Sequence, residues 1–313
     1  RHLGANHPET AQSLKDLALV RHWKGDLDSA AVLYRDAIER FRAQDEPGRG
    51  LAEALNDYGT LLLDVRRFDE AEASFREALT LMRRFLGDSH RDVASNLNNI
   101  ALVLHERKDG AGAAELFEES LEIQRRAAGR DNIGVAYTLN NLAWVYRDMG
   151  DLEAADSLLR LSIDIRRREL GDGHPSVAVG LNNLAMLVLL PSGKVDAADS
   201  VLTDATAVLA RANLGEHPYV ASLMSAQGRV RLAQKRFAEA ERLFRDAFEM
   251  RKRLLGENSV DALSTVADLG AALIAQGKRQ EARRILSDAL PTLESGNHES
   301  AVRVMTLLSS TEP

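Results

Sequence analysis

The chain has 313 residues, no cysteine and a formal net charge of −7; 45% of its residues are hydrophobic but only 5% are aromatic. The absence of cysteine excludes disulfides and thiolate metal sites, and the negative charge argues against a dedicated nucleic-acid binder. No apolar stretch is long enough to span a bilayer and no signal peptide is visible, so we expect a cytoplasmic protein without membrane contact.

A five-residue stretch, Leu139-Asn140-Asn141-Leu142-Ala143, returns in recognisable form along the whole chain. Its seven copies begin at residues 14, 55, 97, 139, 181, 224 and 266, so the intervals are 41, 42, 42, 42, 43 and 42 residues. A period in this range predicts a repeat array in which each unit contacts only its neighbours. Such an array can exceed the size of a single globular core.

Each unit is predicted to form two helices. The stretch lies in the first helix, and the second contains a small–large–small pattern such as Ala71, Phe75 and Ala78. Small residues at this spacing let antiparallel helices approach closely, while the large residue fills the gap between units. In chain order we predict seven helical hairpins, over residues 8–42, 50–86, 91–128, 132–170, 175–213, 218–255 and 259–294.

The turns and joins contain expected helix caps. Glycine at 25, 150 and 277 stands between the two helices of a unit, where a left-handed residue ends the first helix. The joins between units supply proline at a helix start or polar caps: His7-Pro8, Ser89-His90-Arg91-Asp92, His174-Pro175, His217-Pro218 and Asn258-Ser259. Because these histidines recur once per unit, we interpret them as capping residues and not as converging metal ligands.

Three features depart from the simple array. The fifth unit has an extra residue near Pro191-Ser192-Gly193-Lys194, which should shorten its first helix. The tail can form a closing helix over residues 298–308 through Val302, Met305 and Leu308. Arg1-His2-Leu3-Gly4 reads as the end of a helix and a linker, so we expect a single solenoid over 1–313 that is a fragment of a longer protein.

These residues resemble the tetratricopeptide repeat (TPR) family, specifically its longer-period branch typified by kinesin light chain. That branch has Leu-x-x-Leu-Ala in the first helix, Ala-x-x-x-Phe-x-x-Ala in the second and a Leu-Gly-x-x-His-Pro join. The resemblance covers about residues 1–294 and weakens in units six and seven, where Gln227 and Arg231 occupy apolar positions. It implies an all-α, right-handed superhelical solenoid of about seven TPR hairpins, with a concave groove lined by the first helices. It also implies protein or peptide binding without catalysis.

Helical geometry places one face of each first helix away from the second helix. In unit four this face contains Tyr137, Asn140, Asn141, Trp144 and Asp148, and in other units Asn56, Asn98, Asn99, Asn182 and Asn183. An Asn amide offers a donor and an acceptor, so a ladder of amides can pair with the backbone of an extended peptide. Alternatively, the amides bond within the solenoid and hold adjacent hairpins in register, and the aromatic residues pack between helices instead of anchoring a ligand.

The same face contains two positive and seven negative residues, a net charge of −5. They are Lys15 and Arg229 against Asp16, Glu53, Asp57, Asp64, Glu106, Asp148 and Asp268. An acidic surface favours a ligand that contains Lys or Arg. Some TPR domains clamp a C-terminal carboxylate with Lys and Arg from the groove; that set is missing here, so we predict no such clamp.

Nothing in the chain matches a phosphate-binding glycine loop, a zinc-protease helix or a nucleophile elbow, so we predict no enzyme, cofactor or metal. The first functional hypothesis is a monomeric interaction module that captures an extended, Lys- or Arg-containing segment of a partner. The second is a sensor or regulatory region of a larger signalling protein, whose effector would be a kinase, protease or ATPase. The third is a self-assembly scaffold that uses the last two units.

Overall fold

The computed structural model describes residues 8–44, 48–129, 131–257, 259–296 and 298–311. All regular elements in these ranges are helices, which confirms the all-α prediction. The chain divides into two compact units within α8 (Leu152–Leu170), one over Arg1–Leu158 and the other over Leu159–Pro313.

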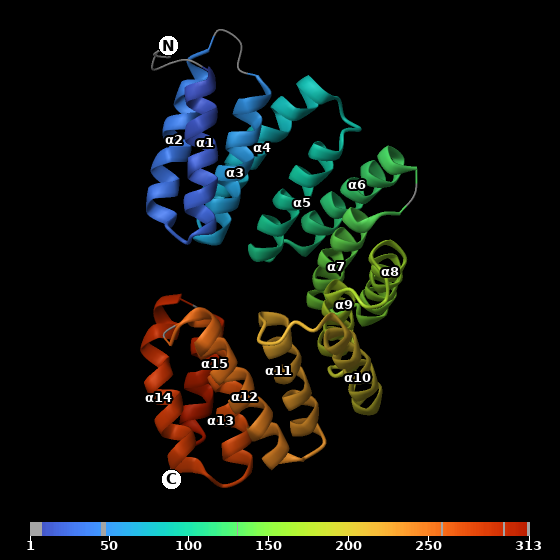
Figure 1. Ribbon diagram of the computed structural model, residues 1–313, viewed down its shortest axis with the longest axis vertical. Helices are drawn as coiled ribbons and strands as arrows, with labels where there is room; N and C mark the ends of the chain where they lie inside the picture. Colours follow the sequence, from blue (N-terminus) through green and yellow to red (C-terminus); the bar gives the residue numbers. More distant parts are fainter. Residues whose placement is uncertain (1–7, 45–47, 130, 258, 297, 312–313) are drawn as a thin grey trace. The chain divides into compact units, whose positions relative to one another are not determined.

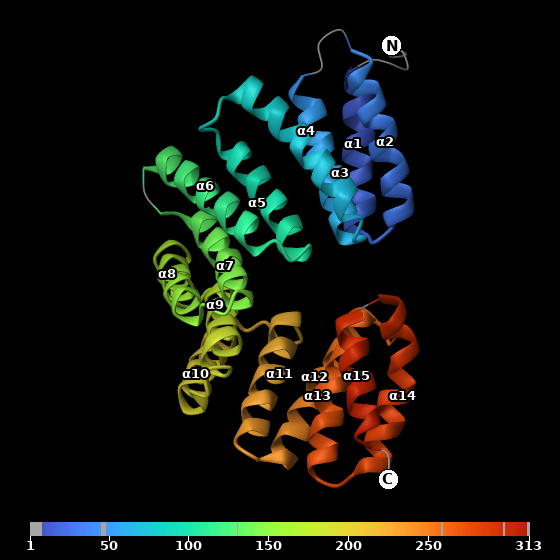
Figure 2. The same ribbon diagram turned by 180° about the vertical axis from the view of Figure 1, so that it is seen from behind.

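Within each unit, successive helical hairpins lie side by side (Figure 1). The first unit contains α1 (Pro8–Trp23), α2 (Leu27–Arg42), α3 (Arg49–Asp64), α4 (Phe68–Leu86), α5 (Arg91–Glu106), α6 (Gly110–Ala128), α7 (Ile133–Asp148) and the start of α8. The second unit contains the rest of α8, α9 (Pro175–Leu184), η1 (Ala185–Leu189), α10 (Val195–Ala212), α11 (Pro218–Ala233), α12 (Phe237–Leu255), α13 (Val260–Ala275), α14 (Arg279–Gly296) and α15 (His298–Ser309) (Figure 2).

Close packing within a hairpin depends on the small–large–small pattern. Ala71, Phe75 and Ala78 of α4 are all 0% exposed. On the facing helix α3, a Cβ placed on Gly59 would lie 2.7 Å from the Phe75 ring, so glycine makes room for the aromatic side chain. The predicted close approach of the two helices is therefore confirmed, but the large residue packs against the first helix of its own hairpin, where the sequence placed it between units.

The turn inside each hairpin has one residue in the left-handed region. Gly25, Gly150 and Gly277 have φ values of 77°, 88° and 78°, as predicted for residues that end the first helix. The structure adds that non-glycine residues occupy the same repeat position in other hairpins: Arg66 at 60°, Lys108 at 66° and Lys235 at 60°.

The histidines at the joins cap the helices that follow them. The Nδ1 atoms of His90, His174 and His217 accept a hydrogen bond from the backbone N–H two residues later, each at 3.1 Å. This confirms their predicted role. The cap expected from Ser259 is wrong, because its side chain makes no capping hydrogen bond, whereas His7 and Asn258 lie outside the described residues.

The extra residue of the fifth hairpin changes the type of helix. The α-helical part ends at Leu184 and continues as the π-helix η1, in which the Leu190 N–H donates to the Ala185 carbonyl at 2.9 Å. A π-helical turn is wider than an α-helical turn, so it absorbs one residue without breaking the helix.

The face through which the closing helix α15 packs matches the expected one only at Leu308, which packs on the core. Val302 and Met305 are 44% and 41% exposed, whereas Ala301 and Val304 are 0% exposed. The buried pair joins the core formed with α13 and α14. The rotation also brings Arg303 to Asp268 of α13, with which it forms an ion pair.

Candidate functional site

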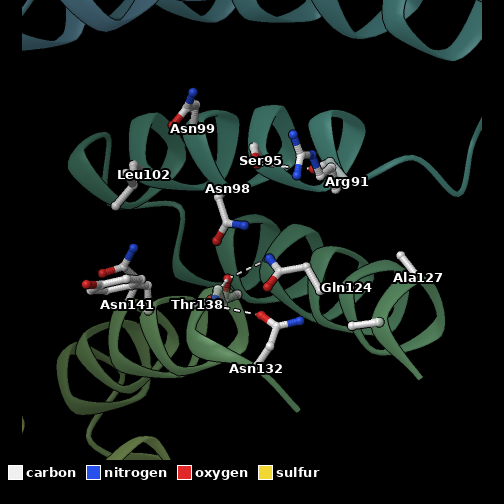
Figure 3. A pocket seen from close by; sticks show the side chains of 13 residues that line it. Arg91, Ser95, Asn98, Asn99, Leu102, Gln124, Ala127, Asn132, Thr138 and Asn141 are labelled. Atoms are coloured by element: carbon white, nitrogen blue, oxygen red, sulfur yellow. Dashed lines mark hydrogen bonds between the residues drawn. The ribbon is translucent and has the colours of Figure 1, made fainter. Parts of the chain in front are cut away.

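A pocket of about 600 Å³ opens between α5, α6 and α7 of the first unit (Figure 3). It is lined by Arg91, Ser95, Asn98, Asn99, Leu102, Gln124, Ala127, Ala128, Asn132, Gly134, Tyr137, Thr138 and Asn141. Four residues predicted from the sequence to contact a partner are among them, namely Asn98, Asn99, Tyr137 and Asn141. The structure therefore brings together residues of two adjacent first helices around one opening.

The wall of the pocket contains a connected set of amides and hydroxyls. The Asn98 Nδ2 group donates to the Ala94 carbonyl at 2.9 Å and lies 2.5 Å from Ser120 Oγ. The Gln124 Nε2 group donates to Ser120 Oγ and to Thr138 Oγ1, both at 2.9 Å. The amide oxygens Asn98 Oδ1 and Gln124 Oε1 are buried and accept no hydrogen bond within the described chain.

A second group of amides joins neighbouring hairpins. Asn56 Oδ1 of α3 accepts hydrogen bonds from Asn96 Nδ2 at 3.1 Å and from Asn99 Nδ2 at 3.0 Å, both on α5. Asn96 is 0% exposed, so this contact satisfies a buried donor. Asn56 and the Nδ2 group of Asn99 therefore hold adjacent hairpins in register. This is one of the two roles that the sequence analysis allowed for these residues, the other being ligand binding.

The remaining predicted residues of the fourth hairpin lie on α7. Tyr137 is 51% exposed at the pocket. Trp144 is half-buried and the guanidinium of Arg147 lies 4.8 Å from the centre of its ring. Asp148 Oδ2 lies 2.8 Å from His105 Nε2 of α5, and Asn140 is half-buried. The side chain of Asn141 forms no hydrogen bond within the described residues and lines the pocket.

In the second unit, Asn182 and Asn183 line a separate pocket of about 200 Å³ with residues of α9, α10 and α11. Asn182 Oδ1 is buried and accepts no hydrogen bond within the described residues. Asn182 is therefore the counterpart of Asn98 two repeats later, beside a smaller opening.

Most of the acidic residues predicted on the first-helix face are paired. Lys15 Nζ lies 2.8 Å from Glu53, His22 Nε2 lies 2.7 Å from Asp64, and Arg66 lies 3.4 Å from Glu106. Asp148 pairs with His105, and Asp268 pairs with Arg229 at 2.8 Å and with Arg303. The net charge counted from the sequence therefore overstates the free acidity of this face.

Asp16 and Asp57 differ from the other five acids. Asp16 accepts a hydrogen bond from Gln12 Nε2 at 2.9 Å, and Asp57 accepts one from Asn56. Neither forms an ion pair with Lys or Arg in the part of the chain that the structure describes. Burial raises the pKa of Asp57, and the charge of Lys15 opposes that rise.

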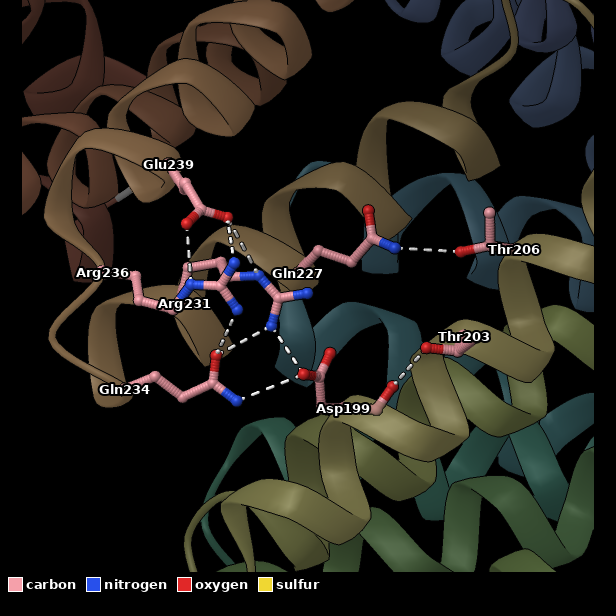
Figure 4. A network of polar contacts seen from close by, with 8 residues as sticks. All are labelled: Asp199, Thr203, Thr206, Gln227, Arg231, Gln234, Arg236 and Glu239. Atoms are coloured by element: carbon pink, nitrogen blue, oxygen red, sulfur yellow. Dashed lines mark hydrogen bonds and ion pairs between the residues drawn. The ribbon is translucent and has the colours of Figure 1, made fainter.

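The polar residues at apolar positions of the sixth hairpin belong to a network between α10, α11 and α12 (Figure 4). Arg231 Nη1 donates to Asp199 Oδ2 at 2.6 Å, and Gln234 Nε2 donates to the same oxygen at 3.2 Å. Gln227 Nε2 donates to Thr206 Oγ1 at 2.9 Å. The hydrogen bond from Arg231 lowers the pKa of Asp199. The network thus replaces apolar packing by charged contacts.

Sequence reasoning missed the second-helix and join residues of the pocket, including Gln124, Ala128, Asn132 and Gly134. The sequence contained one sign of the pocket: the join after the third hairpin reads Ala128-Gly129, where four other joins read Leu-Gly. Within the described residues, no group of three or more His, Cys, Asp or Glu is placed to hold a metal ion. None of the described helices combines the length and apolar character needed to cross a membrane.

The chain was compared with known proteins. The family model described as tetratricopeptide repeat matches residues 50–126, 92–168, 176–253 and 219–295. No curated protein matches the chain. Several solved structures share the fold. BtubC (BKLC) from P. vanneervenii is 24% identical, with a TM-score of 0.59 over 67% of this chain and 84% of that one.

Two further solved structures are similar. A putative kinesin light chain from Podosopora anserina with nearly identical TPR-like repeats is 18% identical, with a TM-score of 0.56 over 67% of this chain and 99% of that one. The apo form of RapI is 15% identical, with a TM-score of 0.67 over 96% of this chain and 99% of that one. Since the family model matches well over half of its length, the chain belongs to the tetratricopeptide repeat family.

Proposed function

We propose that the first unit binds an extended segment of another protein along its first helices α1, α3, α5 and α7. The observation that carries this proposal is the open pocket between α5 and α7, lined by the exposed Tyr137 and the half-buried Asn141. Membership of a family of protein-interaction repeats supports binding over catalysis. The aromatic ring supplies apolar contact area, and the amide of Asn141 supplies both a donor and an acceptor for a peptide backbone.

The proposed segment contains a Lys or Arg that lies near Asp16 and Asp57. These two carboxylates are the acids of the first-helix face that form no ion pair with Lys or Arg within the described residues. A cationic side chain would supply the missing partner and would lower the raised pKa of Asp57. Because the contact lies near the surface, we expect it to contribute specificity and a salt-dependent association rate.

A second candidate function is a regulatory region, in which the bound segment changes the packing of the hairpins and so controls an attached effector. One structural neighbour favours this reading: a Rap protein solved in complex with Competence and Sporulation Factor. It is 14% identical, with a TM-score of 0.59 over 95% of this chain and 73% of that one.

The test is a selection from a random-peptide display library against the parent chain and a Tyr137→Ala/Asn141→Ala variant. Peptides that bind the parent should lose about tenfold or more in affinity on the variant, because an anchor and a backbone contact are removed together. Their Lys or Arg should matter less on an Asp16→Asn/Asp57→Asn variant, by about threefold to fivefold, because one of the two carboxylates is exposed and the other is half-buried.

The matched control is Asn183→Ala, the same change at the equivalent position of the second unit. It should leave the selected peptides bound as tightly as before. Enrichment of acidic peptides, or equal binding to the parent and to the first variant, would contradict the proposal.

A further inference from the structure

The junction between the second and third hairpins is the counterpart of the junction that holds the pocket. Its lining residues stand 42 positions earlier: Arg49, Glu53, Met82, Phe85, Leu86 and Asp92 correspond to Arg91, Ser95, Gln124, Ala127, Ala128 and Gly134. The free volume is about 10 Å³ at the earlier junction and about 600 Å³ at the later one. Because both follow the same repeat, the difference comes from the side chains.

Four truncations open the later junction. Ala127 and Ala128 replace an aromatic and a leucine, Gly134 replaces an aspartate, and Ser95 replaces a glutamate. A Cβ on Gly134 would lie 3.1 Å from Gln124 Oε1 and 3.0 Å from Asn132 Oδ1, so any larger residue would crowd both oxygens. Four other joins keep the leucine that Ala128 replaces, namely Leu86, Leu170, Leu214 and Leu255.

Two hydroxyls in the pocket wall donate to backbone carbonyls. The Ser120 hydroxyl donates to the Ala94 carbonyl at 2.8 Å, and the Thr138 hydroxyl donates to the Gly134 carbonyl at 3.3 Å. Each hydroxyl has one proton, so in this arrangement both accept from the Gln124 amide. The Asn98 amide cannot be reversed, because its oxygen would then face the Ala94 carbonyl.

Two acceptor oxygens, Asn98 Oδ1 and Gln124 Oε1, are consequently left without a donor in the described chain. A buried acceptor without a partner is costly, so a ligand that donates hydrogen bonds here gains more than it would in water. None of the described residues that line the pocket is acidic, and the one cation, Arg91, lies 3.6 Å from Asp92. The pocket therefore offers no ion-pair partner to Lys or Arg.

We infer that this pocket selects a neutral side chain with N–H donors, of which a primary carboxamide, Gln or Asn, is the best match. The side chains of Asn98 and Gln124 line the pocket and turn an oxygen toward the NH₂ group, and the ligand carbonyl accepts from the amide of Asn141. This inference rests on the proposed binding of an extended segment and adds a second, uncharged specificity position to it. The basic side chain of the segment contacts Asp16 and Asp57, and the carboxamide enters the pocket.

The first experiment copies the filled junction into the open one with an Ala127→Phe/Ala128→Leu variant. Peptides selected on the parent should carry Gln or Asn at one position, and replacing that residue by Lys or Leu should weaken binding about tenfold. The variant should lose this preference while it still binds peptides through Tyr137 and Asn141. If the variant selects the same residue as the parent, the pocket holds water only and the inference is wrong.

The matched control is Phe85→Ala/Leu86→Ala, which opens the earlier junction beside Met82. It should gain no preference for a carboxamide, because Met82 offers no amide oxygen. A gained preference would show that empty volume alone selects the residue, which would overturn the role given to the orphan oxygens.

A second measurement separates the pocket from the proposed function. N-acetylglutaminamide and N-acetylleucinamide have the same backbone amides and differ in the side chain, so NMR titration of ¹⁵N-labelled parent isolates the carboxamide. We expect shifts of the Gly134 amide at about millimolar N-acetylglutaminamide and none with the leucine compound. If no peptide binds but this shift occurs, the segment proposal fails and the pocket stands. If peptides bind and Gly134 shifts equally with both compounds, or with neither, the pocket inference fails.

Discussion

Hairpins in the two units use the same repeat position in opposite ways. The third residue of the repeated stretch is Asn99 or Asn141 beside the pocket of the first unit, and it is Asp268 in the last hairpin of the second. Asp268 is 1% exposed and is held between Arg229 and Arg303. An amide at this position leaves hydrogen-bonding capacity for a ligand, whereas the ion pairs of Asp268 use that capacity to join α11, α13 and α15.

A sharper form of the comparison involves two carboxylates at that position, Asp57 and Asp268. Asp268 has two arginine partners, whereas Asp57 has none within the described chain and burial raises its pKa. An aspartate at this repeat position should therefore stabilise the second unit and destabilise the first. Two substitutions test this directly.

Replacing Asp268 by Asn should have the largest effect. It removes the shared carboxylate of two arginines and leaves a buried amide between them, so we expect a loss of about 2–4 kcal/mol in the free energy of unfolding. The half-exposed arginines can turn to water, which keeps the loss below that of a fully buried pair. Urea denaturation followed by hydrogen exchange of α13 measures it. A change below about 0.5 kcal/mol would mean that the ion pairs contribute little to the stability of the folded state.

Replacing Asp57 by Asn should have the opposite sign and a smaller size. Since the folded pKa of Asp57 lies above the unfolded one, the folded state binds the proton more tightly and the parent loses stability as pH rises through that window. The Asn variant should therefore be more stable than the parent by up to about 1 kcal/mol at pH 7. The difference should vanish at pH values below the unfolded pKa of about 4. Unfolding at several pH values checks it, and a destabilised variant at pH 7 would reverse the comparison.

The features that the sequence predicted depend on local position within the repeat. The period, the histidine caps at His174 and His217 and the left-handed Gly150 all follow from neighbours along the chain. The free charge of the first-helix face could not be predicted from local position, because pairs such as Lys15 with Glu53 join residues 38 positions apart on adjacent hairpins. Whether such an acid is free depends on the reach of side chains across the junction.

The pocket was missed for a related reason, since it arises from side-chain atoms that are absent. Ala128 and Gly134 are unremarkable residues in isolation. They become informative only against Leu86 and Asp92 one repeat earlier, and only when packing shows that nothing else fills the space. The face of α15 was mispredicted because Val302 and Val304 are equally apolar, and the contact of Arg303 with Asp268 selects between them.

The smallest predicted effect concerns the turn that all hairpins share. Lys108 has a φ of 66°, whereas Gly150 at the same position of the next hairpin has a φ of 88°. A side chain in the left-handed region costs about 1–2 kcal/mol, and glycine returns part of that gain as greater freedom in the unfolded chain. Lys108→Gly should therefore stabilise the first unit by about 0.5 kcal/mol, measured by thermal or urea unfolding.

The reverse change, Gly150→Lys, is the matched control in the same unit. A Cβ on Gly150 would meet no atom within 4 Å, so only backbone strain and the freedom of the unfolded chain act, and we expect a loss of about 0.5 kcal/mol. Opposite signs for the two substitutions would show that the repeat imposes this conformation whichever residue occupies it. Equal signs would mean that side-chain contacts of Lys108 outweigh the strain of its backbone.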